Sequence, residues 1–430
     1  MAQDRFGNTL DPALGYAWGS IIRNPLDEFR RRTHGMNKIR QRVASHGRGQ
    51  LFNFTGHRRD FLAREADLSE ELAEEWVGTP LIEGQFSELS RNHFGADGGS
   101  VSALFNRSAA GIVATLLTLA SQGDRVVAVA PLQRTHPSVR RGAALAGAQL
   151  EEPNPEEGLP PSLFEGAVLI VLTRVTSELD VMHPDQVQAV VDMAGKAGCP
   201  LFIDDAYGSR VGPALLGHQQ TLAVGADFGI TSCDKAGLGG PRAGLMVGRA
   251  DLVNRVVATA SGLGLEARGP LILGVLRSLE SYDPDTLRRD SALAREIAIV
   301  LQERFGADRV LDLCMGPTIS EEDVLTIALE GQNDKASLYG LVPAEAACML
   351  GMILLVDDGF VTSNVAERPG ARVSLRLRPT AAEVDRFGGP KGVVDAVDAG
   401  FQKLRTLLGE PQTAREIIYG SATDEKTVGV

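Results

Sequence analysis

Short apolar runs alternate with amphipathic stretches between about residues 100 and 250. The runs are VVAVA at 126–130, AVLIVLT at 167–173, PLFIDD at 200–205, FGITS at 228–232 and AGLMVG at 243–248. The stretches at 108–123 and 183–198 place apolar residues at helical spacing, and each ends on a glycine. This alternation predicts βαβ units that form a parallel sheet buried on both faces.

The remainder of the chain has a different pattern. Residues 1–60 are basic and look helical, and they end in the apolar run LFNFTG. A long amphipathic helical stretch begins near residue 270 and leads into two strand-like pieces, ACMLGMILLVDD at 347–358 and ARVSLRLRPT at 371–380. We therefore predict four parts: a helical arm (1–60), a large α/β domain (61–270), a small α+β domain (271–411) and a polar tail (412–430).

Composition and charge exclude several classes of protein. The chain has 430 residues and a formal net charge of −12, which disfavours broad binding to nucleic-acid phosphates. The four cysteines lie far apart and predict neither a zinc site nor a disulfide framework. With no long apolar run and no secretory pattern at the start, we expect a cytoplasmic protein that does not insert into a membrane.

Two segments carry the strongest chemical signal. In FIDDAYGS (202–209) an apolar run places Asp204 at the end of a predicted strand. A carboxylate at such a position can keep the pyridine nitrogen of a bound ligand protonated. In TSCDKAGLGGPRAGLMVG (231–248), Lys235 follows a strand and precedes a glycine-rich turn. A lysine amine attacks an aldehyde when it is deprotonated, as a desolvated or cationic environment favours. Asp204 could instead be a strand-end cap, and Lys235 a surface lysine. These alternatives do not explain why the two residues occur together, 31 positions apart, each at the end of an apolar run.

Together these segments resemble the fold-type-I pyridoxal 5'-phosphate (PLP) enzymes. The stretch from Asp234 and Lys235 through Gly239-Gly240-Pro241-Arg242-Ala243-Gly244 is most similar to that of the selenocysteine synthase (seryl-tRNA selenium transferase)-like family. The resemblance implies an α/β fold with a mostly parallel sheet in the large domain and a smaller α+β C-terminal domain. It also implies that Lys235 carries PLP as a Schiff base and that Asp204 contacts the pyridine nitrogen.

The same resemblance implies further cofactor-binding positions. His136 would stack on the pyridine ring, although it could also be an ordinary loop histidine. Ser108 would hold the phosphate at a helix start, unless it is a plain N-cap. The remaining implied cofactor contacts are Asn106, Arg107, Ala206, Tyr207 and Ser232.

The resemblance also places Arg372 where the superfamily grips the substrate carboxylate, and the forked guanidinium of arginine suits that contact. Arg376 and Arg378 alternate with it along the same predicted strand and stay open as alternatives.

Three functions remain open. The first is a PLP-dependent lyase or transferase that forms an external aldimine, removes the Cα proton through Lys235, and catalyses β- or γ-elimination or replacement. Its substrate would be an amino acid, for example an anionic, phosphorylated or nucleotide-linked one. The second is an aminotransferase, and the third is a PLP-fold binding protein without catalysis. Asp-Asp-Ala-Tyr-Gly departs from the Asp-Leu-Gly-Ser-Gly type of the nearest family, which argues against a tRNA-linked seryl substrate. LFNFTG, with no evident partner in the large domain, favours a homodimer or higher homo-oligomer.

Overall fold

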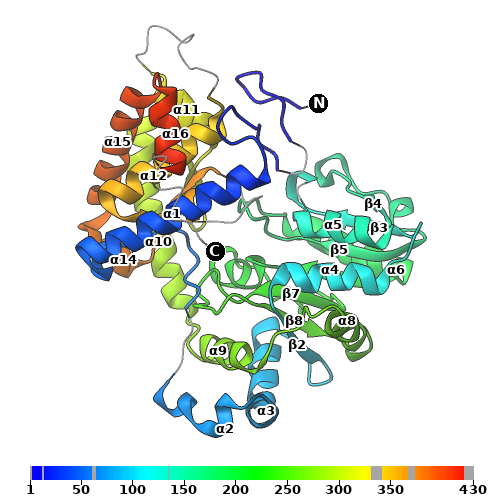
Figure 1. Cartoon of the computed structure of the whole chain (residues 1–430). Helices are drawn as coiled ribbons and strands as arrows, with labels where there is room; N and C mark the ends of the chain where they lie inside the picture. The colour runs from blue at the N-terminus through cyan, green and yellow to red at the C-terminus, as the bar shows by residue number, and fades with distance from the viewer. Residues whose placement is uncertain are drawn as a thin grey trace. The chain divides into compact units, whose positions relative to one another are not determined.

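The computed structural model describes residues 2–11, 14–60, 64–133, 135–330, 341–366 and 373–420. The chain divides into two compact units, one made of residues 57–288 and one that combines residues 1–56 with residues 289–430 (Figure 1). The first is called the α/β unit below, and the second is called the helical unit. Among the described helices, none is long and apolar enough to cross a membrane.

The α/β unit is built on a seven-stranded sheet in the order β2-β8-β7-β6-β5-β3-β4. Its strands are β2 (Val101–Phe105), β3 (Arg125–Val129), β4 (Gln149–Glu151), β5 (Ala167–Leu172), β6 (Leu201–Asp204), β7 (Phe228–Ser232) and β8 (Gly244–Gly248). All neighbours are parallel except β8, which runs antiparallel to β7 and to β2. The predicted mostly parallel α/β fold is confirmed. β8 reverses because the short connection from β7 holds no crossover helix, which a parallel neighbour requires.

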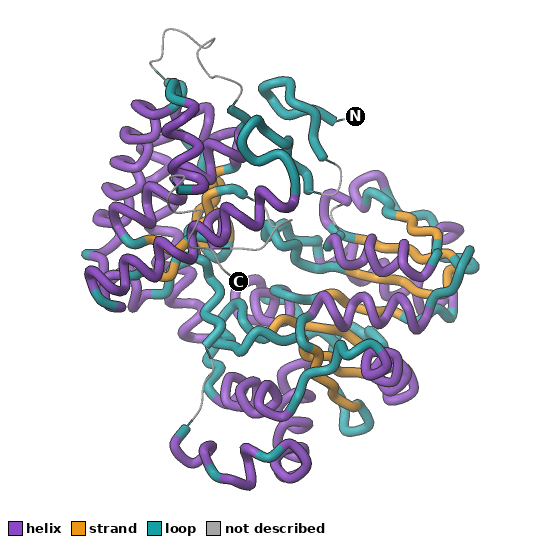
Figure 2. The backbone as a smooth tube through the Cα atoms, viewed as in Figure 1, coloured by secondary structure: helices purple, strands orange, loops and turns teal. Residues whose placement is uncertain are grey.

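Alternate side chains of each central strand point to opposite faces of this sheet. Val126 and Ala128 pack in one core with helices α4 (Ser108–Leu119), α5 (Pro137–Ala146) and α8 (Ala250–Gly262). Val127 and Val129 pack on the other face with α6 (Pro184–Ala197). Helices α3 (Glu75–Phe94) and α9 (Gly269–Glu280) cover the part of that face near β8. The sheet is therefore sandwiched between helices, as its continuous apolar runs predict (Figure 2).

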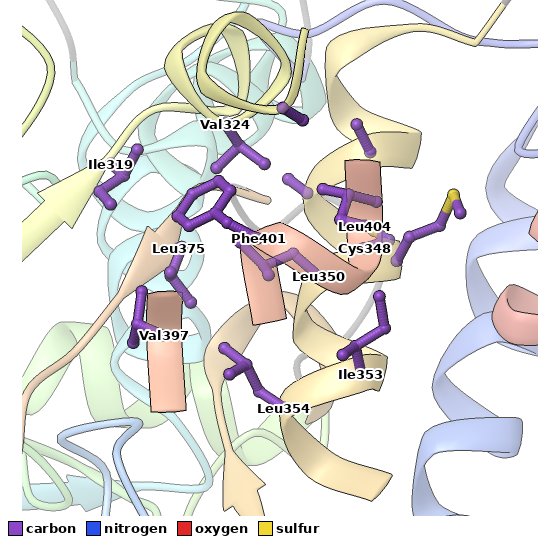
Figure 3. Close-up of a cluster of buried hydrophobic side chains, with 14 of the residues drawn as sticks. Ile319, Val324, Cys348, Leu350, Ile353, Leu354, Leu375, Val397, Phe401 and Leu404 are labelled. Carbon is purple, nitrogen blue, oxygen red and sulfur yellow. The ribbon is translucent and has the colours of Figure 1, made fainter. Parts of the chain in front are cut away.

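The helical unit packs around α12 (Pro343–Asp358) and α15 (Gly389–Leu407). The ring of Phe401 points into its core beside Val324, Leu350 and Leu375 (Figure 3). Its other helices are α1 (Pro25–His46), most of α10 (Pro284–Phe305), α11 (Glu321–Ala328), α13 (Ser363–Ala366), α14 (Ala381–Phe387) and α16 (Pro411–Tyr419). Its strands are β9 (Leu311–Leu313), β10 (Gly316–Ile319) and β12 (Leu375–Arg376) in one sheet, and β1 (Phe52–Asn53) and β11 (Phe360–Val361) in another.

The structure corrects the interpretation of ACMLGMILLVDD as a strand, because this segment forms most of α12. The helix starts with Pro343 in its first turn and ends at Gly359 in the left-handed conformation. An apolar run that is buried on every side has no polar face to reveal its period. Helix α1 also begins only at Pro25, so the helical interpretation is wrong for the described residues before it, 2–11 and 14–24.

The apolar segment LFNFTG finds its partner within the helical unit. Strand β1 pairs in parallel with β11, and the rings of Phe54 and Phe360 lie 4.3 Å apart between centroids. The observation that suggested a second subunit is thereby explained inside one chain. The arm and the C-terminal part share one unit, whereas the sequence divides them at residues 61 and 271.

Candidate active site

The end of β6 carries two adjacent buried carboxylates with opposite surroundings. Asp205 pairs with the buried guanidinium of Arg174, whose Nε lies 3.3 Å from Oδ1, and accepts a hydrogen bond of 2.8 Å from Thr221. Asp204 is only 3% exposed, and its Oδ1 has no hydrogen-bond partner among the described residues. Burial raises the pKa of Asp204 to about 7, against the nearby charge of Lys235 and the backbone N–H of Ala206. Asp204 therefore offers a ligand a buried oxygen that no described residue uses, and Asp205 is neither solvent-facing nor available.

Lys235 lies on the loop between β7 and β8, beside Asp204 and Tyr207. Its Nζ stands 4.7 Å from the centroid of the buried Tyr207 ring. The following residues, Ala236 and Gly237, both have positive φ angles, of 47° and 90°. Alanine rarely adopts this left-handed backbone, so the chain is tightly constrained directly after the lysine.

The fully buried guanidinium of Arg210 holds the loop that carries Lys235 through hydrogen bonds to its backbone. It donates to the carbonyls of four residues around the site and to two hydroxyls, and no carboxylate among the described residues pairs with it. The carbonyl acceptors are Ala206 (3.1 Å), Ser232 (2.7 Å), Lys235 (3.1 Å) and Ala236 (3.1 Å), and the hydroxyl acceptors are Ser209 (3.0 Å) and Thr231 (2.9 Å). Burial lowers the pKa of Arg210 from its usual value. The guanidinium thus ties the segment after Asp204 to the segment that carries Lys235.

The start of α4 and the end of β7 form a small polar cradle. The hydroxyl oxygens of Ser108 and Ser232 lie 3.0 Å apart, although the two residues are far apart in sequence. A Cβ atom on Gly244 would lie 2.4 Å from the backbone nitrogen of Ser108, so only glycine fits there. Two hydroxyls at the first turn of a twelve-residue helix fit a phosphate group, because the first N–H groups of a helix lack internal partners.

Arg107 and Asn106 precede this helix in different roles. Arg107 is its N-cap residue, with an extended backbone and no capping bond from its side chain. The exposed Asn106 uses its side-chain amide to donate to the carbonyl of Gly264 at 3.2 Å. The structure thus shows Asn106 supporting the loop before α4.

His136 caps the start of α5. Its Nδ1 accepts a hydrogen bond of 3.2 Å from the backbone of Ser138, so in the neutral ring the proton is on Nε2. Burial, with the nearby positive charges of Lys235 and Arg107, lowers the pKa of His136 to about 4. The ring is therefore neutral at pH 7 and lies within the electrostatic reach of the lysine.

Sequence reasoning did not assign a site role to Arg210, Asp234 or Arg59. Arg59 donates to Asp234 at 2.8 Å, and His57 Nε2 lies 2.9 Å from the hydroxyl of Tyr207. The only signal for Asp234 is its place beside Lys235. Arg210 stands in an apolar stretch, GSRVGPALLG, which hints at a buried guanidinium but not at its acceptors.

The family of this chain follows from its similarity to known proteins. A UPF0425 pyridoxal phosphate-dependent protein of Methanothermobacter thermautotrophicus is 33% identical over 400 residues, which cover 93% of this chain and all of that protein. The chain belongs to this UPF0425 family. A second UPF0425 protein, from Methanosphaera stadtmanae, is 28% identical over 381 residues, 88% of this chain and 95% of its own. No model of a protein family matches the chain.

Solved structures show the fold of this UPF0425 member. A probable N-succinyldiaminopimelate aminotransferase from Thermus thermophilus superposes with a TM-score of 0.54 at 16% identity, over 87% of this chain and 99% of its own. SepCysS, in a complex with the N-terminal domain of SepCysE, gives a TM-score of 0.54 at 15% identity, over 83% of this chain and 95% of its own. At these identities the likeness concerns the fold alone. The resemblance to fold-type-I PLP proteins is confirmed.

The predicted carboxylate-binding arginine of this UPF0425 member, Arg372, lies outside the described residues. Its two alternatives belong to the helical unit and are buried. Arg376 sits in β12 and donates to the hydroxyl of Ser374 at 2.8 Å, and Arg378 forms a parallel bridge with Thr55. The choice among the three remains a prediction.

Proposed function

We propose that the α/β unit binds PLP with Lys235 as its covalent anchor and acts on the Cα–H bond of an amino-acid substrate, with β- or γ-elimination or replacement as the outcome. The observation that carries this proposal is the buried Oδ1 of Asp204 beside Lys235, which has no hydrogen-bond partner among the described residues. Family membership supports the cofactor. Bound PLP supplies an electron sink for the charge that proton removal leaves at Cα.

Each side chain of the site has a distinct task in this proposal. Asp204 holds the proton of the pyridine nitrogen, and its pKa of about 7 suits a group that shares a proton near neutral pH. Ser108 and Ser232 bind the phosphate with the first turn of α4. His136 presents a neutral ring, which adds no charge beside the lysine. Lys235, once released from the cofactor, removes the Cα proton as a base.

Arg107 supports an anionic substrate class. It is the N-cap residue of α4, directly beside the phosphate cradle, and its charge helps to lower the pKa of His136. A cation at this position favours amino acids with a second negative group over neutral ones. O-phosphoserine and aspartate are therefore the substrates to test first, with alanine as the neutral reference.

Absorption spectroscopy of the full chain with added PLP tests the anchor. The unmodified protein should develop a Schiff-base band that borohydride fixes covalently, and Lys235→Ala should abolish both the band and all turnover. Lys196→Ala, which removes an exposed lysine at the end of α6, serves as the matched control and should behave as the unmodified protein. A Schiff-base band that borohydride still fixes covalently in Lys235→Ala would refute the assignment.

Product analysis separates the two reaction classes. Elimination from O-phosphoserine releases phosphate, ammonia and a keto acid in equal amounts, and leaves the cofactor in its aldehyde form. Transamination instead converts the cofactor to its amine form and needs a keto acid to restore it. Stoichiometric accumulation of the amine form, without ammonia, would make the aminotransferase the correct function.

Homo-oligomeric assembly stays a prediction. The segment that suggested it, LFNFTG, packs inside its own unit. Light scattering of the full chain with and without PLP measures the assembly directly, and a fully active monomer would exclude the homo-oligomer.

A further inference from the structure

Residues 57–60 are seated tightly against the lysine loop of the α/β unit. The backbone N–H of Asp60 donates to the carbonyl of Gly239 at 2.8 Å. A Cβ atom on Gly240 would lie 2.8 Å from the carbonyl oxygen of Asp60 and 2.9 Å from the Cα of Arg59. Arg59 itself has a φ of 57°, a conformation that a non-glycine residue rarely adopts. This close approach fixes the positions of His57 and Arg59 relative to Lys235.

A chain of hydrogen bonds runs from the lysine loop to Tyr207 through these two side chains. Arg59 Nε donates to Asp234 Oδ2 at 2.8 Å, and Arg59 Nη2 lies 3.3 Å from His57 Nδ1. His57 Nε2 lies 2.9 Å from the hydroxyl of Tyr207. Burial alone would raise the pKa of Asp234, but the charge of Lys235 and the charge and hydrogen bond of Arg59 lower that pKa. Asp234 is thus the anion that holds Arg59 in place.

The chemistry of arginine sets the direction of every bond in this chain. A guanidinium only donates, so His57 Nδ1 must accept and cannot carry a proton. The neutral ring then carries its proton on Nε2, and that N–H donates to the oxygen of Tyr207. Because the oxygen of Tyr207 accepts from His57, the hydroxyl proton of Tyr207 points away from His57.

We infer that Arg59 and Asp234 lock His57 as its Nε2–H tautomer, and that His57 thereby makes Tyr207, over whose ring Lys235 Nζ stands, a hydrogen-bond donor in a direction away from His57. His57 and Arg59 are thus positioning residues. The functional consequence rests on the proposed function, but the tautomer does not, and the two can be tested apart.

Nitrogen NMR of the full chain, labelled with ¹⁵N-histidine and studied without and with PLP, tests the lock. The chain has seven histidines, and the His57 signals are assigned by their loss in His57→Gln. We expect one protonated and one unprotonated nitrogen for His57, with the proton on Nε2. Arg59→Met removes the donor to Nδ1 and should give a mixture of tautomers. The exposed His183, at the N-cap of α6, is the internal control and should be unchanged in that variant.

The pH midpoint of the cofactor absorption band tests the effect of this arrangement on the Lys235 Schiff base. His57→Leu removes the donor to Tyr207, so more negative charge remains beside Lys235 and the midpoint should move to higher pH. His57→Gln keeps an N–H at the end of the side chain and should restore most of the shift. A merely structural role for His57 would leave the midpoint unchanged in both variants, provided that they bind PLP.

The outcomes distinguish this inference from the proposed function. A proton on Nδ1 of His57 in the unmodified chain, or the same single tautomer in Arg59→Met, would overturn the lock while leaving Lys235 as the anchor. Failure of Lys235 to bind PLP would overturn the proposed function, whereas the tautomer measured without cofactor would still decide the lock.

Discussion

Asp204→Asn should stabilise the cofactor-free protein while it destroys activity. Burial raises the pKa of Asp204 from 3.8 to about 7. The folded state therefore binds more protons than the unfolded chain between these two values, and its stability falls as the pH rises through that window. At about 1.4 kcal/mol for each pKa unit, the charged carboxylate costs about 4 kcal/mol at pH 8 and less than about 2 kcal/mol at pH 5.

An asparagine at this position is neutral at every pH and nearly the same size. The free energy of unfolding of the variant should therefore exceed that of the unmodified protein by about 4 kcal/mol at pH 8, and the gain should shrink by roughly 2–3 kcal/mol at pH 5. Urea unfolding at several pH values, with PLP removed, measures this difference. In the presence of PLP the order should reverse, because only the carboxylate gains a partner.

The adjacent residue provides the matched control. Asp205→Asn makes the same chemical change one position further along but leaves the buried guanidinium of Arg174 without its carboxylate. That variant should lose about 3–5 kcal/mol at pH 8 and at pH 5 alike. If both variants lost stability to a similar extent at pH 8, the assignment of Asp204 as a carboxylate that awaits a ligand would be wrong.

Three further changes probe the site. Gly244→Ala places a methyl group against the backbone of Ser108 and should lower stability by about 1–3 kcal/mol and weaken PLP binding, as thermal unfolding and spectral titration would show; unchanged values would mean that β8 and the start of α4 can move apart without cost. Arg210→Met leaves buried carbonyls without donors and should lower the free energy of unfolding by at least about 3 kcal/mol, as chemical unfolding would show; a stable variant with normal PLP affinity would contradict the role of Arg210 in holding the Lys235 loop. Ser108→Ala and Ser232→Ala should each weaken PLP binding about tenfold with little effect on the melting temperature, and unaltered affinity would move the phosphate elsewhere.

The fold of the α/β unit was predictable because its strands are apolar on both faces and are separated by amphipathic helices. The positions of Asp204 and of the Lys235 loop follow directly from this pattern, since Asp204 lies at the end of one predicted strand and Lys235 follows another. The same reasoning failed for α12, where an equally apolar run is a helix, because uniform burial removes the polar positions that distinguish a period of 2 from one of 3.6.

Contacts between distant residues account for what sequence reasoning missed at the site. His57 meets Tyr207 across 150 residues of sequence, and Arg59 meets Asp234 across 175. No local spacing encodes such pairs. Arg210 donates mainly to backbone carbonyls, which every residue carries, so its surroundings could not be predicted from the sequence. The lysine and the aspartate have a recognisable spacing, whereas the residues that position them do not.

The division of the chain into units has a consequence for its synthesis. The α/β unit is continuous, so all its residues have left the ribosome before most of the helical unit has been made. The helical unit must instead wait, because Glu345 binds the backbone of Ile21 and Ile22 at 2.6 and 2.7 Å, and Tyr419 donates to the carbonyl of Ile21 across 398 residues. Residues 1–56 are thus made before the α/β unit but complete their packing only after residues 289–430. During translation Phe52 and Phe54, which are buried in the folded unit, therefore lack this packing until the C-terminal part of the chain has been made.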